Sequence, residues 1–345
     1  MAASTSRTAT SYKITIGGRS FTQPQSDGLE QLVLEDHVDM VSYLSVRLGG
    51  GEGAPNWEVE LGDPVEVKLG AGEVLLFKGE VTAVEPNWGM GGVASLNVRA
   101  LDNTHRLARG RKTRWFKDKK DSDVASTVGG ECQLSVEADA TEETHAYILQ
   151  RNESDLAFLR RLAARNNYKL SVEQGKLTFK KADFNGQAVT LKMGESIRNL
   201  RVQMNTQDQV SKVVVRGWDP REKKEIVGTA TVGDIDSIGG GDTGAQTASG
   251  KFGEHTAYIT DVPVASQAEA TALAKSEMNR LARQFCHGTC TADGNDKLRA
   301  GSSVSLAGLT KGYNGTFFIV SSRHVISAQT GYTTEFSFVS NTKGT

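Results

Sequence analysis

The sequence is poor in cysteine, in proline and in long apolar runs, and each shortage excludes a class of protein. Three cysteines in 345 residues cannot hold a disulfide scaffold together. Cys286 and Cys290 have only His287 beside them, which is too few ligands for a structural zinc site, so we expect buried thiols. No apolar run reaches the roughly 18 residues that a transmembrane helix needs. The first residues, MAASTSRTATSYK, lack the apolar stretch of a secretory signal peptide, so we expect assembly in the cytoplasm.

An excess of charge of either sign is also missing. The 40 Lys and Arg residues balance 41 Asp and Glu residues, so the overall charge gives no reason to expect a nucleic-acid or membrane partner. The 37 glycines, together with short alternating runs of Val, Ile and Thr, favour many strands joined by tight turns. We therefore expect a mostly β protein of the α+β class, with more than one domain at this length.

Residues 1–107 are predicted to form a tube-like antiparallel β-barrel. Runs such as YKITIGG and DPVEVKLG alternate polar and apolar residues, which places Val65 and Val67 on the same face of one strand. Glycine-rich turns, including the loop GGGEGAPN, separate the runs. This pattern is typical of small barrels and sandwiches.

Residues 108–190 are predicted to form an α+β connecting domain. The stretch RNESDLAFLRRLAARNNYKLSV places its apolar residues on one face and its arginines on the other, at the spacing of a helix. We expect this helix at 153–166, with Asn152 as its N-cap, and a hairpin at 168–180. A helix of about three turns is marginal alone, so it must pack against the hairpin. The preceding run DSDVASTVGGE is predicted to form a shorter helix.

Residues 191–235 and 251–345 are predicted to form a second tube-like barrel. It contains a helix at 266–285, which opens with Ser266 and Glu269 in capping-box spacing. The runs DPVEVKLG, FKGEVTAVEP and SLNVRAL near the N-terminus have counterparts of the same order and pattern near the C-terminus, namely GSSVSLAG, YNGTFFIVSSRHVI and TEFSFVS. We interpret this as two related barrels in one chain.

Residues 236–250 are predicted to be a flexible glycine-rich loop, and they contain a weak nucleotide-binding motif. Gly239, Gly241 and Gly244 satisfy G-x-G-x-x-G, but neither the buried strand before such a motif nor the helix after it is expected here. No metalloprotease or serine-hydrolase motif is present, and the six histidines are scattered. We therefore expect no enzyme, metal or cofactor, although a triad assembled by the fold stays open.

Residues 106–120, RLARGRKTRWFKDKK, form a densely basic stretch. Three interpretations stay open: a solvated connection between domains, a surface for an acidic protein, or a site for a polyanion such as nucleic acid. The candidate partner-contact residues are Arg106, Arg109, Arg111, Lys112, Arg114, Trp115 and Lys117.

The stretch YILQRNESDLAFLRRLAARNNYKLSVEQGKLTF resembles a motif of the phage late control D and VgrG family, the central hub proteins of contractile tail baseplates. The family pattern is Y-x-x-Q-x-x-E-S-D-x-x-F-(I/L)-x-R-L, followed by a hairpin. The closing segment, with Gly315, His324 and the run GYTTEF, is similar to the family's last barrel, and LEDHVDMVSYLSVRL resembles its first. The motif positions are filled by Tyr147, Gln150, Glu153, Ser154, Asp155, Phe158, Leu159, Arg161 and Leu162.

The resemblance implies a structural homotrimer in which each chain supplies two barrels, so that six similar units form a ring. Such a hub would join a sixfold tail tube to a threefold spike, contact the surrounding baseplate subunits, and belong to a virion tail or an extracellular injection particle. Because the sequence stops at Thr345 without a β-helical spike, we expect the spike to be a separate protein. The alternatives are a baseplate-associated cell-wall-degrading enzyme and a nucleic-acid-binding β protein.

Overall fold

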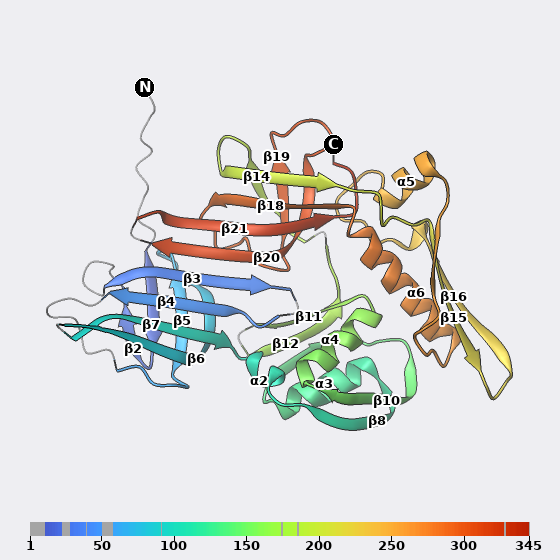
Figure 1. Cartoon of the computed structure of the whole chain (residues 1–345), viewed down its shortest axis with the longest axis horizontal. Helices are drawn as coiled ribbons and strands as arrows, with labels where there is room; N and C mark the ends of the chain where they lie inside the picture. The colour runs from blue at the N-terminus through green and yellow to red at the C-terminus, as the bar shows by residue number, and fades with distance from the viewer. Residues whose placement is uncertain are drawn as a thin grey trace.

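A long curled sheet with two smaller units beside it makes up the molecule (Figure 1). The mostly β, α+β class predicted from the sequence is confirmed. Within the part of the chain that the structure describes, no helix is both long and apolar enough to cross a bilayer. Most of the predicted loop GGGEGAPN lies outside the described residues. The computed structural model describes residues 11–22, 28–38, 40–49, 58–90, 92–173, 175–184, 186–327 and 329–344.

The two ends of the chain together form the long sheet, which has 13 strands. The N-terminal strands are β1 (Tyr12–Ile16), β2 (Arg19–Phe21), β3 (Leu29–His37), β4 (Tyr43–Gly49), β5 (Pro64–Leu69), β6 (Val74–Gly89) and β7 (Gly92–Asp102). The C-terminal strands are β13 (Val189–Lys192), β14 (Ile197–Met204), β18 (Cys286–Asp293), β19 (Ser303–Ala307), β20 (Gly315–Ser327) and β21 (Gly331–Ser340).

One pair of strands joins the two halves of this sheet. β3 pairs antiparallel with β20, from Gln31 opposite Ser327 to His37 opposite Ser321. The pairing path runs β14-β18-β21-β20-β3-β4-β7-β6-β5-β1-β2, and β19 attaches β13 to β20. The two units that the sequence presents as separate barrels are therefore halves of one continuous sheet. Among the described residues, this path is open at both ends, β14 and β2.

Each half buries its own apolar face. In the N-terminal half, Val65 and Val67 are fully buried, as the alternation along their strand predicts. In the C-terminal half, Phe338 packs in a core that includes Cys286 and Cys290, so these thiols are buried as expected. Burial raises the pKa of both thiols to about 12. Because the thiolate is the reactive form, the two cysteines act as small packing residues.

A middle unit lies between the halves in sequence and beside the sheet in space (Figure 1). Its hairpin, predicted at 168–180, forms with Tyr168 opposite Lys181. Its core consists of the apolar faces of the two longer helices packed on this hairpin and on a two-stranded sheet. The elements are α2 (His105–Ala108), β8 (Lys112–Lys120), α3 (Asp121–Glu131), β9 (Ser135–Ala138), β10 (Thr144–Glu153), α4 (Asp155–Arg165), β11 (Tyr168–Glu173) and β12 (Lys176–Lys181).

Helix α4 is the helix predicted at 153–166, but its N-cap differs from the prediction. Asn152, the predicted cap, lies in β10 with a φ of 47°. Ser154 caps the helix instead, because its Oγ accepts a hydrogen bond from the backbone N of Ala157 at 3.2 Å. Ser and Asn are nearly equivalent N-caps, so the local sequence alone does not decide between them. Phe158 on the apolar face is fully buried.

A further unit contains strands that the sequence places in the second barrel. In the structure these strands form a separate three-stranded sheet, in the order β16-β15-β17, that packs on α6. Val213 and Val215 face Ala270 and Ala274 in its core, so this unit has an apolar centre of its own. Its elements are β15 (Lys212–Asp219), β16 (Lys224–Thr231), η1 (Val232–Asp234), α5 (Gly244–Phe252), β17 (Thr256–Ile259) and α6 (Gln267–Ala282).

Helix α5 corrects the prediction of a flexible loop over 236–250. The run from Gly244 is helical because Thr243 and Gln246 form a capping box, with Gln246 N donating to Thr243 Oγ1 at 3.2 Å and Thr243 N donating to Gln246 Oε1 at 2.8 Å. Ile238 before it is fully buried. The capping pattern T-x-x-Q is present in the sequence, but the surrounding glycines favour the prediction of a loop.

The contact between β16 and α6 gives a testable prediction about packing. A Cβ atom on Gly228 would lie 2.1 Å from the backbone C of Ala270, so a side chain there must push the strand from the helix. We expect Gly228→Ala to lower the free energy of unfolding by about 1–3 kcal/mol in urea denaturation. Gly250→Ala is the matched control, because its Cβ would meet nothing within 4 Å inside α5. Equal effects of the two changes would contradict the packing argument.

Candidate functional site

Most of the basic segment forms strand β8, which is largely exposed but is part of the folded middle unit. β8 pairs antiparallel with β10, with Arg114 opposite Gln150 and Trp115 opposite Leu149. Since side chains alternate along a strand, Arg114 points toward the helices of the middle unit and Trp115 points away from them. The segment therefore presents two different chemical faces.

The inward face of β8 meets the family motif in a buried polar network. Gln150 is fully buried, and its Oε1 accepts from Arg114 Nε at 2.7 Å. Its Nε2 donates to Asp155 Oδ1 at 2.9 Å, and Arg114 Nη2 donates to the same oxygen at 3.0 Å. Lys112 Nζ lies 2.6 Å from Asp155 Oδ2. These bonds tie β8, β10 and the first turn of α4 together, where a carboxylate also suits the helix dipole.

Other residues of the motif also hold α4 against β8 and β10. Glu153 accepts from Arg161 at 2.7 Å, and Arg161 also donates to the backbone O of Leu149 at 2.7 Å. Phe158 stacks on Phe116 with ring centroids 5.8 Å apart. We interpret the motif as the joint that holds α4 on the two-stranded sheet. The sequence identifies the motif, but it gives no sign that Arg114 and Lys112 are partners within it.

The remaining candidate contact residues do not gather into one surface. Arg106 forms an ion pair with Glu80 of the N-terminal half, and Arg111 donates to the backbone O of Asn152 at 3.1 Å. Arg109 is exposed just after α2. Of the seven candidates, Arg106, Arg111, Lys112 and Arg114 are thus engaged inside the chain, whereas Arg109, Trp115 and Lys117 are exposed.

The outward face of β8 and β10 carries aromatic and cationic side chains. Trp115 is 59% exposed and Tyr147 is 56% exposed. Their rings stack diagonally across the two strands, with centroids 6.1 Å apart and an interplanar angle of 23°. Lys117 lies opposite Tyr147, and Lys119 is the next exposed lysine along β8. We call Trp115, Lys117, Lys119, Tyr147 and Leu149 the outer face.

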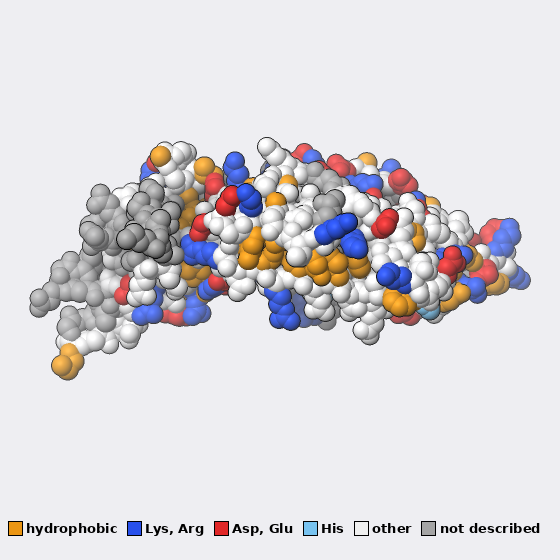
Figure 2. Space-filling view, turned by 90° about the horizontal axis from the view of Figure 1, so that it is seen from above, with side chains coloured by type: hydrophobic (Ala, Val, Ile, Leu, Met, Phe, Trp, Pro, Cys, Tyr) orange, Lys and Arg blue, Asp and Glu red, His pale blue; other side chains and the backbone are white. Residues whose placement is uncertain are grey.

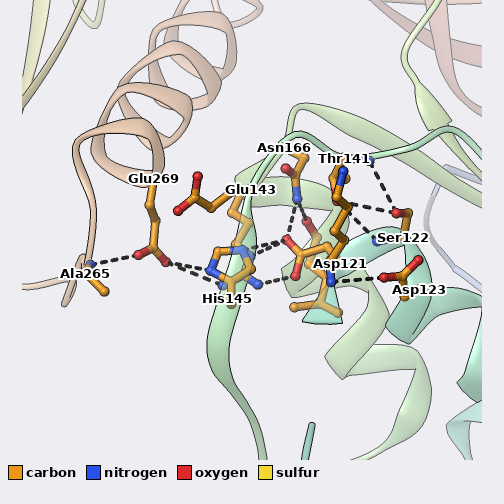
Figure 3. Close-up of polar contacts among 12 residues, drawn as sticks. Asp121, Ser122, Asp123, Thr141, Glu143, His145, Asn166, Ala265 and Glu269 are labelled. Carbon is orange, nitrogen blue, oxygen red and sulfur yellow. Dashed lines mark hydrogen bonds and ion pairs between the residues drawn. The ribbon is translucent and has the colours of Figure 1, made fainter. Parts of the chain in front are cut away.

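A second polar cluster lies where the middle unit meets α6 (Figure 3). Asp121, the first residue of α3, accepts from Arg165 Nε and from Asn166 Nδ2, each at 2.6 Å. His145 of β10 stands between two carboxylates, with Nε2 3.7 Å from Asp121 Oδ2 and Nδ1 3.7 Å from Glu269 Oε1 (Figure 3). Four elements that are distant in sequence meet here, so no local motif announces the cluster.

The charge state of Asp121 follows from these contacts. Its side chain is almost completely buried, and burial alone would raise its pKa. The contact with His145, together with the charge and the hydrogen bonds of the Arg165 guanidinium, outweighs that effect and lowers the pKa of Asp121 to about 2. The carboxylate is therefore ionised at neutral pH and holds α3, α4 and β10 together.

A cleft of about 580 Å³ adjoins this cluster between α4 and α6. Its carboxylates already have partners: Glu143 accepts from Ser266 Oγ at 2.8 Å, and Glu277 accepts from Arg280 at 2.7 Å. Glu269 Oε2 accepts from the backbone N of Ala265, as Figure 3 shows. Among the residues that the structure describes, no group of three or more His, Cys, Asp or Glu is placed to hold a metal ion.

Comparison with known sequences gives a family and a curated relative. The model of the Alg8 N-terminal domain family matches residues 58–328. The probable baseplate hub protein of Escherichia phage 186 is 30% identical over 209 residues, which cover 58% of this chain and 51% of that protein. The chain therefore spans about half the length of this curated relative. The resemblance to baseplate hub proteins that the motif predicts is confirmed by this match.

Two solved structures share the fold over nearly the whole chain. The 43 kDa tail protein of prophage MuSo2 from Shewanella oneidensis has a TM-score of 0.72 and 15% identity, covering 96% of this chain and 99% of that chain. The tail protein from Neisseria meningitidis MC58 has a TM-score of 0.70 and 14% identity, covering 97% of each chain. At such identities the likeness establishes the fold alone.

Proposed function

The chain belongs to the Alg8 N-terminal domain family, and from this premise and its hub-protein relative we propose that it is a structural subunit of a baseplate hub, in a contractile injection system or a phage tail. The hub is a homotrimer. Its task is mechanical: it holds tube, spike and surrounding baseplate subunits in register. No bond-making chemistry is part of this role.

The internal repeat supports a ring with six similar parts. β5, β6 and β7 form an antiparallel meander in the N-terminal half, and β19, β20 and β21 form another in the C-terminal half. Each half has its own apolar core. Three chains then supply six comparable half-barrels around one axis, which is the arrangement that an adaptor between a sixfold tube and a threefold spike requires.

The observation that carries the trimer is an uncovered edge. β14 ends the pairing path within the described chain, and its Leu200, Val202 and Met204 are only partly buried against the C-terminal core. Figure 2 looks onto the side where β14 lies in Figure 1, and apolar side chains gather along the middle of that face. An open strand edge with a partly exposed apolar row suits a subunit contact better than it suits solvent.

Oligomer measurements test this proposal. We expect native mass spectrometry of the full chain to show a trimer, and electron micrographs to show a threefold ring with a hollow centre. Replacing Leu200 and Val202 by serine should raise the trimer dissociation constant at least about tenfold, because two apolar side chains leave the interface. Val74→Ser is the control, since Val74 is 49% exposed on the N-terminal half.

Two results would contradict the proposal. One is a wild-type chain that stays monomeric alone and in the presence of its spike protein. The other is a Leu200→Ser/Val202→Ser variant that keeps its melting temperature and still forms trimers as tightly as wild type. Melting temperature separates a lost interface from a lost fold.

A further inference from the structure

We propose that the outer face binds an extended acidic segment of another baseplate protein, which lies along the edge of β8. This inference rests on the proposed hub function, because it assigns one of the hub's contacts. Three properties of the outer face support this contact: its charge, its aromatic surface and the strand edge beside it.

The charge of the outer face is one-sided. The cross-strand pairs on it are Trp115 with Leu149 and Lys117 with Tyr147, and no carboxylate is among them. Lys119 lies opposite His145, whose ring turns toward Asp121 and Glu269. Lys117 has only Asp118 nearby, at 3.9 Å, with both side chains more than two-thirds exposed. The inward cations of β8 are already neutralised by Asp155 and Glu131. The two outward lysines therefore remain available to an anionic partner.

The aromatic pair supplies the apolar part of such a site. Trp115 and Tyr147 stack on each other and leave more than half of each side chain in solvent. Large aromatic side chains dominate the energy of protein interfaces because they bury much surface at little cost in conformational entropy. A solvated face of a stable strand pair has no packing need for a Trp and a Tyr side by side. The pair suits a partner that places an apolar side chain on it.

The edge of β8 decides the shape of the partner. β8 and β10 form a two-stranded sheet, and elsewhere in the described chain no strand pairs with either. Lysines on an exposed edge repel an identical edge, so pairing with a second copy of this strand is disfavoured. An acidic strand is attracted to this edge instead. Directly opposed side chains of neighbouring strands lie about 4.5–5.5 Å apart, and opposite charges at that distance attract each other. Strand addition is an established way for a sheet edge to bind a peptide.

A protein segment fits better than nucleic acid. Nucleic-acid binding typically neutralises about 6–10 phosphates, whereas the outer face contributes two lysines. The nearby Arg106, Lys112 and Arg114 are held in ion pairs within the chain. Lys117 and Lys119, which follow Trp115 along β8, match an extended peptide that places one apolar and two acidic side chains at alternate positions, on the same face.

Fluorescence anisotropy with the full chain in its native oligomer tests the inference. The probe is a short labelled peptide, Thr-Val-Thr-Glu-Thr-Glu-Thr, whose valine and two glutamates share one face of a strand. We expect the peptide to bind with an affinity that falls as the salt concentration rises. Lys117→Glu/Lys119→Glu should raise its dissociation constant at least about tenfold, and Trp115→Ala should raise it by a similar factor. The matched control is Lys223→Glu/Lys224→Glu, which reverses two exposed lysines in the β15–β16 turn and should leave binding unchanged.

Modified peptides test the placement along the edge. In a strand, alternate backbone N–H groups point to the same side. Peptides methylated on the nitrogens of the valine and the two glutamates, or on those of the threonines between them, should therefore differ, one binding and the other failing. Equal affinities of the two series would overturn the edge placement.

Other outcomes would overturn the inference as a whole. These are no binding of the peptide, equal binding of the peptide with both glutamates replaced by lysine, or tighter binding of a single-stranded oligodeoxythymidylate that also depends on Lys117 and Lys119. Native mass spectrometry of the same samples keeps the two proposals apart. If the trimer persists while the peptide fails to bind, the hub function stands and only the assigned contact falls.

Discussion

Replacing Asp121 by alanine should lower the free energy of unfolding by about 3–5 kcal/mol, because it leaves buried cationic and polar partners without their anion. The carboxylate accepts from Arg165 and Asn166 and contacts His145, and its side chain is 1% exposed. Denaturation in urea, followed by circular dichroism, measures the change. Asp261→Ala is the control, since Asp261 is exposed between β17 and α6.

The same residue predicts how stability depends on pH. The pKa of Asp121 is lowered from 3.8 to about 2 in the folded chain, so the folded state binds its proton less readily than the unfolded state does. Its contribution of about 2 kcal/mol is present above pH ~4 and is lost as the pH falls toward 2. Asp121→Asn cannot titrate there, so the stability difference between wild type and this variant should shrink over that range. A difference that stays constant from pH 5 to about 2 would contradict the argument.

Replacing Arg299 by methionine should weaken the connection between the two halves of the long sheet. Arg299 precedes β19 in the C-terminal half, yet it forms an ion pair with Asp36 of β3 and donates from Nη1 to the backbone O of Leu76 at 2.6 Å. Asp36 is 6% exposed, and its Oδ1 has no hydrogen-bond partner. Methionine fills similar space but leaves that buried carboxylate uncompensated. We expect a loss of about 3 kcal/mol.

Calorimetry should show the consequence for cooperativity. Each half has its own core, so a weaker connection should broaden or split the unfolding endotherm of the Arg299→Met variant. Arg323→Met is a close control, because Arg323 pairs with Glu35, the residue before Asp36, and with Glu335. These three side chains are each more than 40% exposed, so we expect less than about 1 kcal/mol. Equal effects of the two arginine changes would argue against a special role for the buried pair.

For the hub subunit proposed above, both predictions concern how force passes through the chain. The Asp121 cluster connects the middle unit to α6, and the Asp36–Arg299 pair connects the two sheet halves. A structural adaptor must keep such units in fixed relation while its neighbours move. Buried ion pairs are costly to break by removing one partner, and they impose a defined geometry on what they join.

Several elements of this protein follow from local sequence. The alternation through Val65 and Val67 predicts a strand with one buried face, and the helical spacing through Phe158 predicts the apolar side of α4. These patterns depend only on which side chains share a face, which is a property of neighbouring residues. The motif that contains Gln150 and Asp155 is likewise continuous in sequence, so its resemblance to hub proteins is visible there.

The two wrong local predictions, the N-cap of α4 and the loop over 236–250, have a common cause. Asn152 and Ser154 are comparable capping residues, and the strand pairing of β10 decides between them. Thr243 and Gln246 start a helix inside a glycine-rich run because Gly244 lies against Phe285, which holds the turn on the C-terminal core. In each case a distant contact adds free energy comparable to the local preference and so determines the outcome.

The sequence by itself determined that this is a mostly β chain with a hub-like motif, because alternation and spacing are read from residues a few positions apart. Only the tertiary structure decided that both ends share one sheet, and that β8 turns Arg114 inward and Trp115 outward. Pairing β3 with β20 joins residues almost three hundred positions apart, as the contact between Arg323 and Glu35 shows with a separation of 288. Backbone hydrogen bonds are alike for every residue, so their partners are chosen by the packing of the whole chain.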